Sequence, residues 1–223
     1  MISLFRKNLF INSIFLLPYI LILRLKFLLD PGSLPVVPSF GYLTSKIVPA
    51  NGNPLASVIL VVFITFINAL QINRLTIKNH LFKEHTLLPG MFYALFSSIL
   101  IAFIPASDVH FATFFILLAI QSIFSSYNNV KSADDIFLSG FYLSVATLFY
   151  FPAIILIVFG YFGFSIMRSF TAKEVLQYLL GWATPFYLVM IYQYYSGDYN
   201  FVIPNYFFNK FGFVQLISGF NLV

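Results

Sequence analysis

The sequence predicts an all-α membrane protein, a polytopic bundle of seven to eight transmembrane helices. Composition is the first observation behind this prediction: 60% of the 223 residues are hydrophobic and only 9% are charged. Soluble domains carry roughly a quarter charged residues, so this chain cannot cover a globular surface with polar groups. The second observation is the block 134–195, where three apolar runs follow one another with short polar interruptions. Residues 1–223 are therefore predicted to form a single transmembrane domain in a lipid bilayer.

Seven apolar runs are predicted to form helical spans, and an eighth follows them. The run 109–124 is short for a hydrocarbon core of about 30 Å, so it either lies partly buried among its neighbours or extends into 125–129. The eighth run ends without a polar flank, which predicts that the natural protein continues and that this chain is truncated at its C-terminal end. The predicted spans are 9–29, 55–72, 87–104, 109–124, 136–149, 152–167, 175–194 and 206–223.

The first span and the loop after it contain the strongest local signals. Pro18 falls inside the span, where it removes a backbone hydrogen bond and predicts a kink. The Asp-Pro-Gly turn at Asp30 ends the span. In the Pro-rich segment that follows, Phe40, Leu43 and Ile47 recur at helical spacing. This spacing predicts an amphipathic helix lying in the membrane interface, and the alternative is an irregular loop.

The distribution of basic residues predicts the orientation of the chain. With the N-terminus in the cytoplasm, eight of the 12 lysines and arginines fall on the cytoplasmic side and four on the other, as the positive-inside rule requires. The expected location is a bacterial inner membrane, with the first span uncleaved because no small-residue cleavage site follows the basic N-terminus. The four outer residues are Arg24, Lys26, Lys46 and Lys210.

Several classes of function are disfavoured by what the sequence lacks. The chain has no cysteine, which excludes disulfides, thiolate metal sites and a cysteine nucleophile. The basic residues stand singly between apolar runs and form no stripe, so nucleic-acid binding is rejected. His110, His80 and His85 have no neighbours at metal-ligand spacing, and no metal or cofactor is expected. No nucleotide-binding or hydrolase motif is present.

The block 134–195 carries the residues of a family resemblance. Its features are a small-residue face, Ser139-Gly140, after an acidic pair, a Phe-Tyr-Phe-Pro turn ending at Pro152, Arg168 closing the next span, and Gly181 with Pro185. The block resembles a multi-pass inner-membrane family of unknown function that is common in Bacteroidota. More remotely, the layout is similar to that of the GT-C membrane glycosyltransferases.

The GT-C resemblance implies a site on the outer side of the membrane. These enzymes use a carboxylate in the first outward loop as base and often a second acid in the next outward loop. The matching catalytic residues here are Asp30 and Asp108. Basic residues at the membrane surface hold the phosphate of a polyprenyl-phosphate-linked sugar, and the matching positions are Arg24, Lys26 and Lys46.

Other interpretations of the same residues stay open. Arg24 and Lys26 either snorkel to the interface or contact a lipid phosphate. Asp30 is otherwise a turn residue, and Asp108 an N-cap. The favoured function is envelope biogenesis on a GT-C-like scaffold, with enzymatic activity left undecided. The alternatives are a non-catalytic subunit that packs against other membrane proteins and, third, a transporter.

Overall fold

The computed structural model describes residues 13–30, 41–47, 54–82, 86–99, 103, 107–128, 132–167 and 171–196, and the regular structure within these ranges is entirely helical. The predicted eighth run, 206–223, and the start of the first span lie outside the described residues. The helices are α3 (Leu16–Leu23), α4 (Leu25–Leu29), α5 (Tyr42–Ile47), α6 (Pro54–Lys78), α7 (Leu88–Ile99), α8 (Asp108–Asn128), α9 (Ala133–Phe149), the 3-10 helix η3 (Phe151–Ile154), α10 (Ile155–Met167) and α11 (Ala172–Ser196).

Three of these helices, α6, α8 and α11, are long and apolar enough to cross a membrane, and α7 and the segment Phe151–Met167 are shorter apolar helices. The all-helical prediction is confirmed at this level. Helix α8 continues to Asn128, so the longer of the two interpretations of the short run is the one observed. That the shorter helices also cross the membrane stays a prediction.

The predicted first span is broken at Arg24 into α3 and α4. Pro18 was expected inside a helix, but it lies in the first turn of α3, after a turn at Phe15, where a proline is tolerated. Arg24 ends α3 and precedes α4, with φ −106° and ψ 11°, which are not helical values. The break turns the arginine side chain into the bundle, as described below.

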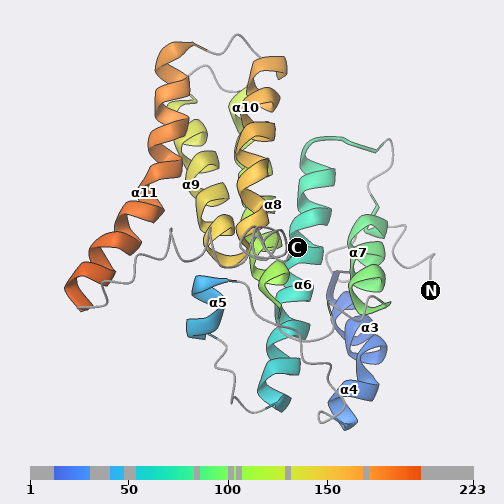
Figure 1. Ribbon diagram of the computed structural model, residues 1–223. Helices are drawn as coiled ribbons and strands as arrows, with labels where there is room; N and C mark the ends of the chain where they lie inside the picture. Colours follow the sequence, from blue (N-terminus) through green and yellow to red (C-terminus); the bar gives the residue numbers. More distant parts are fainter. Residues whose placement is uncertain are drawn as a thin grey trace, which may run out of the picture.

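Helix α9 is the centre of one half of the molecule. It packs most extensively against α8 and α11, while α10 and η3 cover it further (Figure 1). Most buried residues of α9 lie on the broad face that meets its neighbours, while Leu138, Phe141 and Val145 lie on a less buried side. In the other half, α3, α6 and α7 pack together, and α6 also contacts α8 and so joins the two halves.

Glycines let α9 and α11 approach at backbone contact distance. A Cβ on Gly140 would overlap the carbonyl oxygen of Tyr178, and a Cβ on Gly181 would overlap that of Phe137. Such small residues at helix interfaces are how transmembrane helices gain close van der Waals packing in lipid. The small-residue face of α9 and the Gly181–Pro185 region, both singled out by the sequence, therefore face each other.

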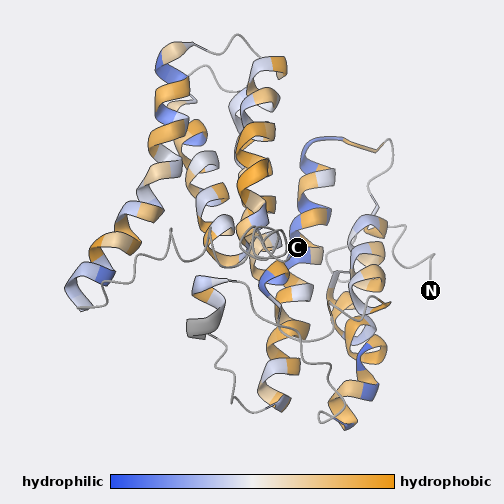
Figure 2. Cartoon of the chain, in the orientation of Figure 1, coloured by the Kyte–Doolittle hydropathy of each residue, from blue (hydrophilic) through white to orange (hydrophobic). Residues whose placement is uncertain are grey.

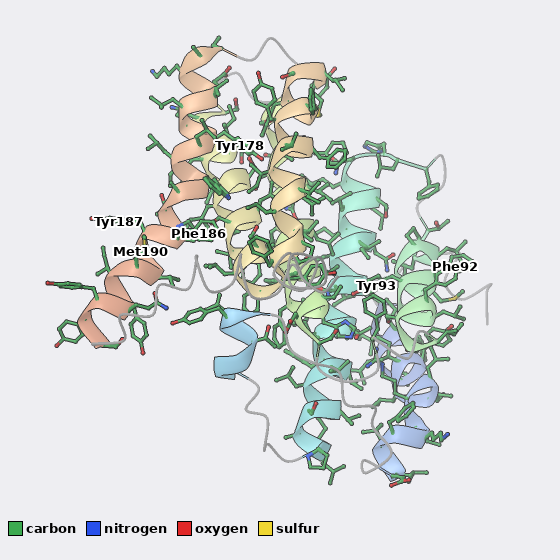
Figure 3. The ribbon with its side chains drawn as sticks, viewed as in Figure 1. Phe92, Tyr93, Tyr178, Phe186, Tyr187 and Met190 are labelled. Atoms are coloured by element: carbon green, nitrogen blue, oxygen red, sulfur yellow. The ribbon has the colours of Figure 1, made fainter. Side chains whose placement is uncertain are left out.

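Tyr178 of α11 connects α10 to the α9–α11 pair. Its hydroxyl donates to the carbonyl oxygen of Ile157 at 2.8 Å, and its ring packs edge-on against Phe164 at 5.7 Å between centroids. Figure 3 shows Tyr178 lying between α11 and α10. A Cβ on Gly160 would come within 2.5 Å of the hydroxyl oxygen, so glycine is required there too. One tyrosine thus joins three helices.

Helix starts are marked by polar residues. Asp134 and Asp135 lie in the first turn of α9, where a negative charge is favoured by the helix dipole. At α11, Thr171 and Glu174 form a capping box: the Glu174 carboxylate accepts from the Thr171 amide at 2.9 Å, and the Glu174 amide donates to the Thr171 hydroxyl at 3.4 Å. The short helix α5 is present where an interfacial helix was predicted, and it packs against α9.

Large apolar side chains cover much of the surface. Ile166 is 84% exposed on α10, and Ile59 and Phe63 on α6 are about equally exposed at 60% and 62%. Hydrophilic colour collects toward the end of α6 and the start of α11, while α10 is hydrophobic along its length (Figure 2). Soluble proteins rarely expose apolar surface on this scale, so these helices fit a lipid bilayer.

The glycine contacts between α9 and α11 generate a direct test. Gly140→Ala should lower the thermal midpoint of the detergent-purified protein, because overpacking a close contact costs about 1–3 kcal/mol. The matched control is Gly163→Ala, since a Cβ on Gly163 has no heavy atom within 4 Å. Equal midpoints for the two variants would contradict the close approach of α9 and α11.

Candidate functional site

Arg24 is the largest fully buried side chain in the described part of the chain, with 1% of its surface exposed. Its Nη2 donates to the carbonyl oxygens of Ser97 and Phe103, each at 3.2 Å, and its Nε lies 3.4 Å from the Ser98 hydroxyl. Ser97 and Ser98 belong to the last turn of α7. The guanidinium is therefore held inside the protein by the end of α7 and by the segment that leads from α7 to α8.

The carbonyl oxygen of Phe103 is shared between Arg24 and His110. The Nε2 of His110 lies 2.7 Å from this oxygen, and the ring stacks edge-on against that of Phe103 at 5.8 Å. A carbonyl oxygen only accepts hydrogen bonds, so Nε2 must carry the proton. His110 is itself 1% exposed. One main-chain oxygen thus links the break in the first span to the start of α8.

Asn68 extends the polar cluster to α6. Its Nδ2 donates to the hydroxyl of Tyr93 at 3.1 Å and to the carbonyl oxygen of His110 at 3.0 Å. Asn68 is fully buried, and Figure 3 shows Tyr93 on the side of α7 that faces α6. A single amide therefore ties α6, α7 and α8 together.

A second asparagine, Asn73, connects α6 to α7. The Oδ1 of Asn73 accepts from the amide of Gly90 at 2.8 Å, in the first turn of α7. A Cβ on Gly90 would lie 2.5 Å from Asn73 Nδ2, so glycine is needed for this bond to form. We name the side chains of Arg24, Asn68, Tyr93, Ser97, Ser98 and His110, with the Phe103 carbonyl, the polar cluster.

The structure brings some of the predicted site residues together. Asp108 is the first residue of α8 and is 3% exposed, two positions before His110 of the polar cluster. Arg24 and the Asp108–His110 helix start therefore lie at one junction. The predicted pairing of Asp30 with Asp108 stays a prediction.

The remaining predicted residues lie differently. Lys26 is exposed on α4, with its Nζ 5.9 Å from the centre of the Phe27 ring. Asp30 is also exposed, at the end of α4. Its main-chain N–H donates a hydrogen bond to the carbonyl oxygen of Lys26 at 3.0 Å. Lys46 belongs to α5, but its side chain lies outside the described part. The catalytic and phosphate-binding roles of these residues remain predictions.

For Arg24, burial replaces the snorkelling interpretation. A snorkelling arginine reaches out to the headgroups, whereas this one turns inward to protein carbonyls. Sequence reasoning also missed Asn68 and Tyr93. The available signal for Asn68 was its position: it is one of two amide side chains, with Gln71, inside the apolar span 55–72, where polar side chains are costly and mark partners inside the bundle.

Removing the arginine tests whether it supports the fold from inside. Arg24→Met should lower the thermal midpoint in detergent, because the Ser97 carbonyl loses its donor at a cost of about 1–3 kcal/mol. Lys26→Met removes the same charge from an exposed position and should change stability by less than about 0.5 kcal/mol. A midpoint for Arg24→Met equal to that of wild type would contradict the described hydrogen bonds.

Comparison of the chain with protein-family models, with curated proteins and with solved structures gives no match.

Proposed function

We propose that this chain is a polytopic inner-membrane protein of cell-envelope biogenesis that handles polyprenyl-phosphate-linked sugars on a GT-C-like scaffold. In this proposal the apolar helices form seven or eight spans with the N-terminus in the cytoplasm. The observation that carries it is the buried arginine beside the start of α8. An ionisable side chain inside a helical membrane protein is costly, and such residues mark sites where a charged group is handled.

Lys26 and Arg24 would act on a lipid phosphate in two different ways. Lys26 is exposed and can reach the phosphate of a lipid carrier directly. Arg24 is enclosed by protein, so it supplies a fixed positive charge behind that contact and acts through space in a medium of low dielectric. A lipid phosphate at the outer end of α4 would thus meet two cationic groups, one mobile and one fixed.

The acids would provide the chemistry. In sugar transfer from a lipid phosphate, the acceptor hydroxyl attacks the anomeric carbon, the bond from that carbon to the phosphate oxygen breaks, and the lipid phosphate leaves. Asp30, exposed near Lys26, would take the acceptor proton as general base. Asp108, buried at the start of α8, would act as the second acidic position.

A second candidate function is that of a non-catalytic subunit, and the C-terminal half of α11 favours it. This half leans away from α9 in Figure 1, and Tyr187, Tyr192 and Tyr195 are 64%, 62% and 91% exposed. Tyrosines of this kind also suit the membrane interface without any partner. Purification in mild detergent separates the two functions, because a stoichiometric protein would copurify with a subunit.

Lipid analysis of the purified protein tests the proposed function. Wild type should copurify with a polyprenyl-phosphate lipid that is detectable by mass spectrometry, and Lys26→Ala should reduce its amount several-fold. The matched control is Lys78→Ala, an exposed lysine at the last residue of α6, which should retain the lipid. Asp30→Asn should keep the lipid but abolish sugar transfer, since a turn tolerates asparagine. Absence of any polyprenyl lipid from wild type would refute the proposal.

Orientation is tested by labelling single cysteines, which the cysteine-free chain makes simple. Asn79→Cys, just after α6, should resist a membrane-impermeant maleimide in intact cells and react after the membrane is opened. Asp30→Cys should react in intact cells. Labelling of Asn79→Cys from outside would reverse the proposed topology.

A further inference from the structure

Hydroxyl groups in these helices follow a regular pattern. Many of the described serine and threonine side chains donate to the main-chain carbonyl three or four residues earlier, which is the usual way to satisfy a hydroxyl within a membrane helix. Thr113 bonds to Val109 at 2.7 Å, and Thr147 bonds to Leu143 at 2.8 Å. A buried hydroxyl that departs from the pattern therefore calls for another partner.

Thr65 departs from it, as do Thr44, Ser107 and Ser144, and Thr65 is the one that lies one turn from a second buried oxygen without a described partner. This residue lies in the middle of α6 and is 0% exposed, yet its Oγ1 has no hydrogen-bond partner among the described residues. One turn further on, Asn68 is also 0% exposed, and its Oδ1 is likewise without a partner within those ranges. The Nδ2 of Asn68 faces the carbonyl of His110, an acceptor only, so the amide cannot be turned round to satisfy its oxygen.

The two oxygens belong to one stripe of α6. Val58, Val61, Val62, Thr65, Asn68 and Ala69 are all buried and recur at helical spacing. Side chains three positions apart on a helix stand about 5–6 Å from each other at Cβ. A single oxygen atom that makes two hydrogen bonds of about 2.8 Å can span that separation.

We propose that Thr65 and Asn68 form a binding site for an O–H group inside the bundle. The bound hydroxyl would donate to Asn68 Oδ1 and accept a second hydrogen bond from the Thr65 hydroxyl. Its source is either a buried water molecule or a hydroxyl of a lipid-linked sugar. An anion does not suit a site with an amide oxygen, and the buried Arg24 guanidinium of the same polar cluster disfavours a cation.

The bound O–H group would complete the hydrogen bonding of Asn68 in the polar cluster. Asn68 donates both of its N–H groups, to Tyr93 and to His110, and its oxygen would accept from the bound group, so each of its polar atoms would have a partner. Buried polar atoms of native proteins are nearly always satisfied, by ordered water where no protein group is within reach. The inference does not depend on the proposed function, because water alone can fill the site.

Thr65→Val gives results of opposite sign for a filled and an empty site. If the hydroxyl binds an O–H group, the substitution should lower the thermal midpoint by about 2–4 °C, the shift expected for one net hydrogen bond in a chain of this size. If the hydroxyl has no partner, replacing it with a methyl group should leave the midpoint unchanged or raise it. Thr147→Val is the matched control: this buried hydroxyl bonds only within its own helix, and its loss should cause little change.

Two media distinguish the source of the O–H group. The full chain is measured in detergent free of lipid-linked sugar and in nanodiscs that contain a polyprenyl-phosphate hexose. A loss of stability in both media supports water, and a loss only in the nanodiscs supports the sugar hydroxyl. No loss, or a gain, in both media overturns the site. Should Thr65→Val fail to fold, Thr65→Ser and Thr65→Ala differ only in the hydroxyl, and equal midpoints for that pair overturn it as well.

Discussion

The arrangement of the helices depends on the close approach of α9 and α11. Each helix presents a glycine to the other's main chain, Gly140 to the Tyr178 carbonyl and Gly181 to the Phe137 carbonyl. In lipid there is no hydrophobic force between apolar helices, so contact at backbone distance supplies the attraction instead. With α11 fixed on one side of α9 and α8 on another, α10 is held by the Tyr178 hydroxyl.

The other half of the molecule is organised by polar contacts rather than by glycine packing alone. Asn68 joins three helices, and Asn73 holds the first turn of α7 through the Gly90 amide. Arg24 then connects the broken first span to the end of α7. Taking a guanidinium out of water costs several kcal/mol, which the hydrogen bonds from Arg24 to main-chain oxygens offset in part.

This division gives the chain a scaffold half and a polar half, joined where α6 meets α8. The buried polar groups that connect separate helices through side-chain amides, imidazole and guanidinium lie in the polar half. The predicted acids also belong to it: Asp30 ends α4, and Asp108 begins α8. A role for this protein in handling a charged lipid would therefore depend on α3, α4, α6, α7 and α8, with α9 to α11 setting their positions.

Sequence alone determined the class of fold, because apolar runs of helical length and scarce charges admit only helices in lipid. It also singled out Gly140 and Gly181 as features of the block 134–195, and the structure shows that they form the α9–α11 contact. It did not show that Arg24 turns inward or that Asn68 meets Tyr93 and His110. Those contacts join residues far apart along the chain, and no local pattern encodes which helices become neighbours. Only the tertiary structure decided them, because the backbone break at Arg24 and the packing of α6 against α7 and α8 set where each polar group finds its partner.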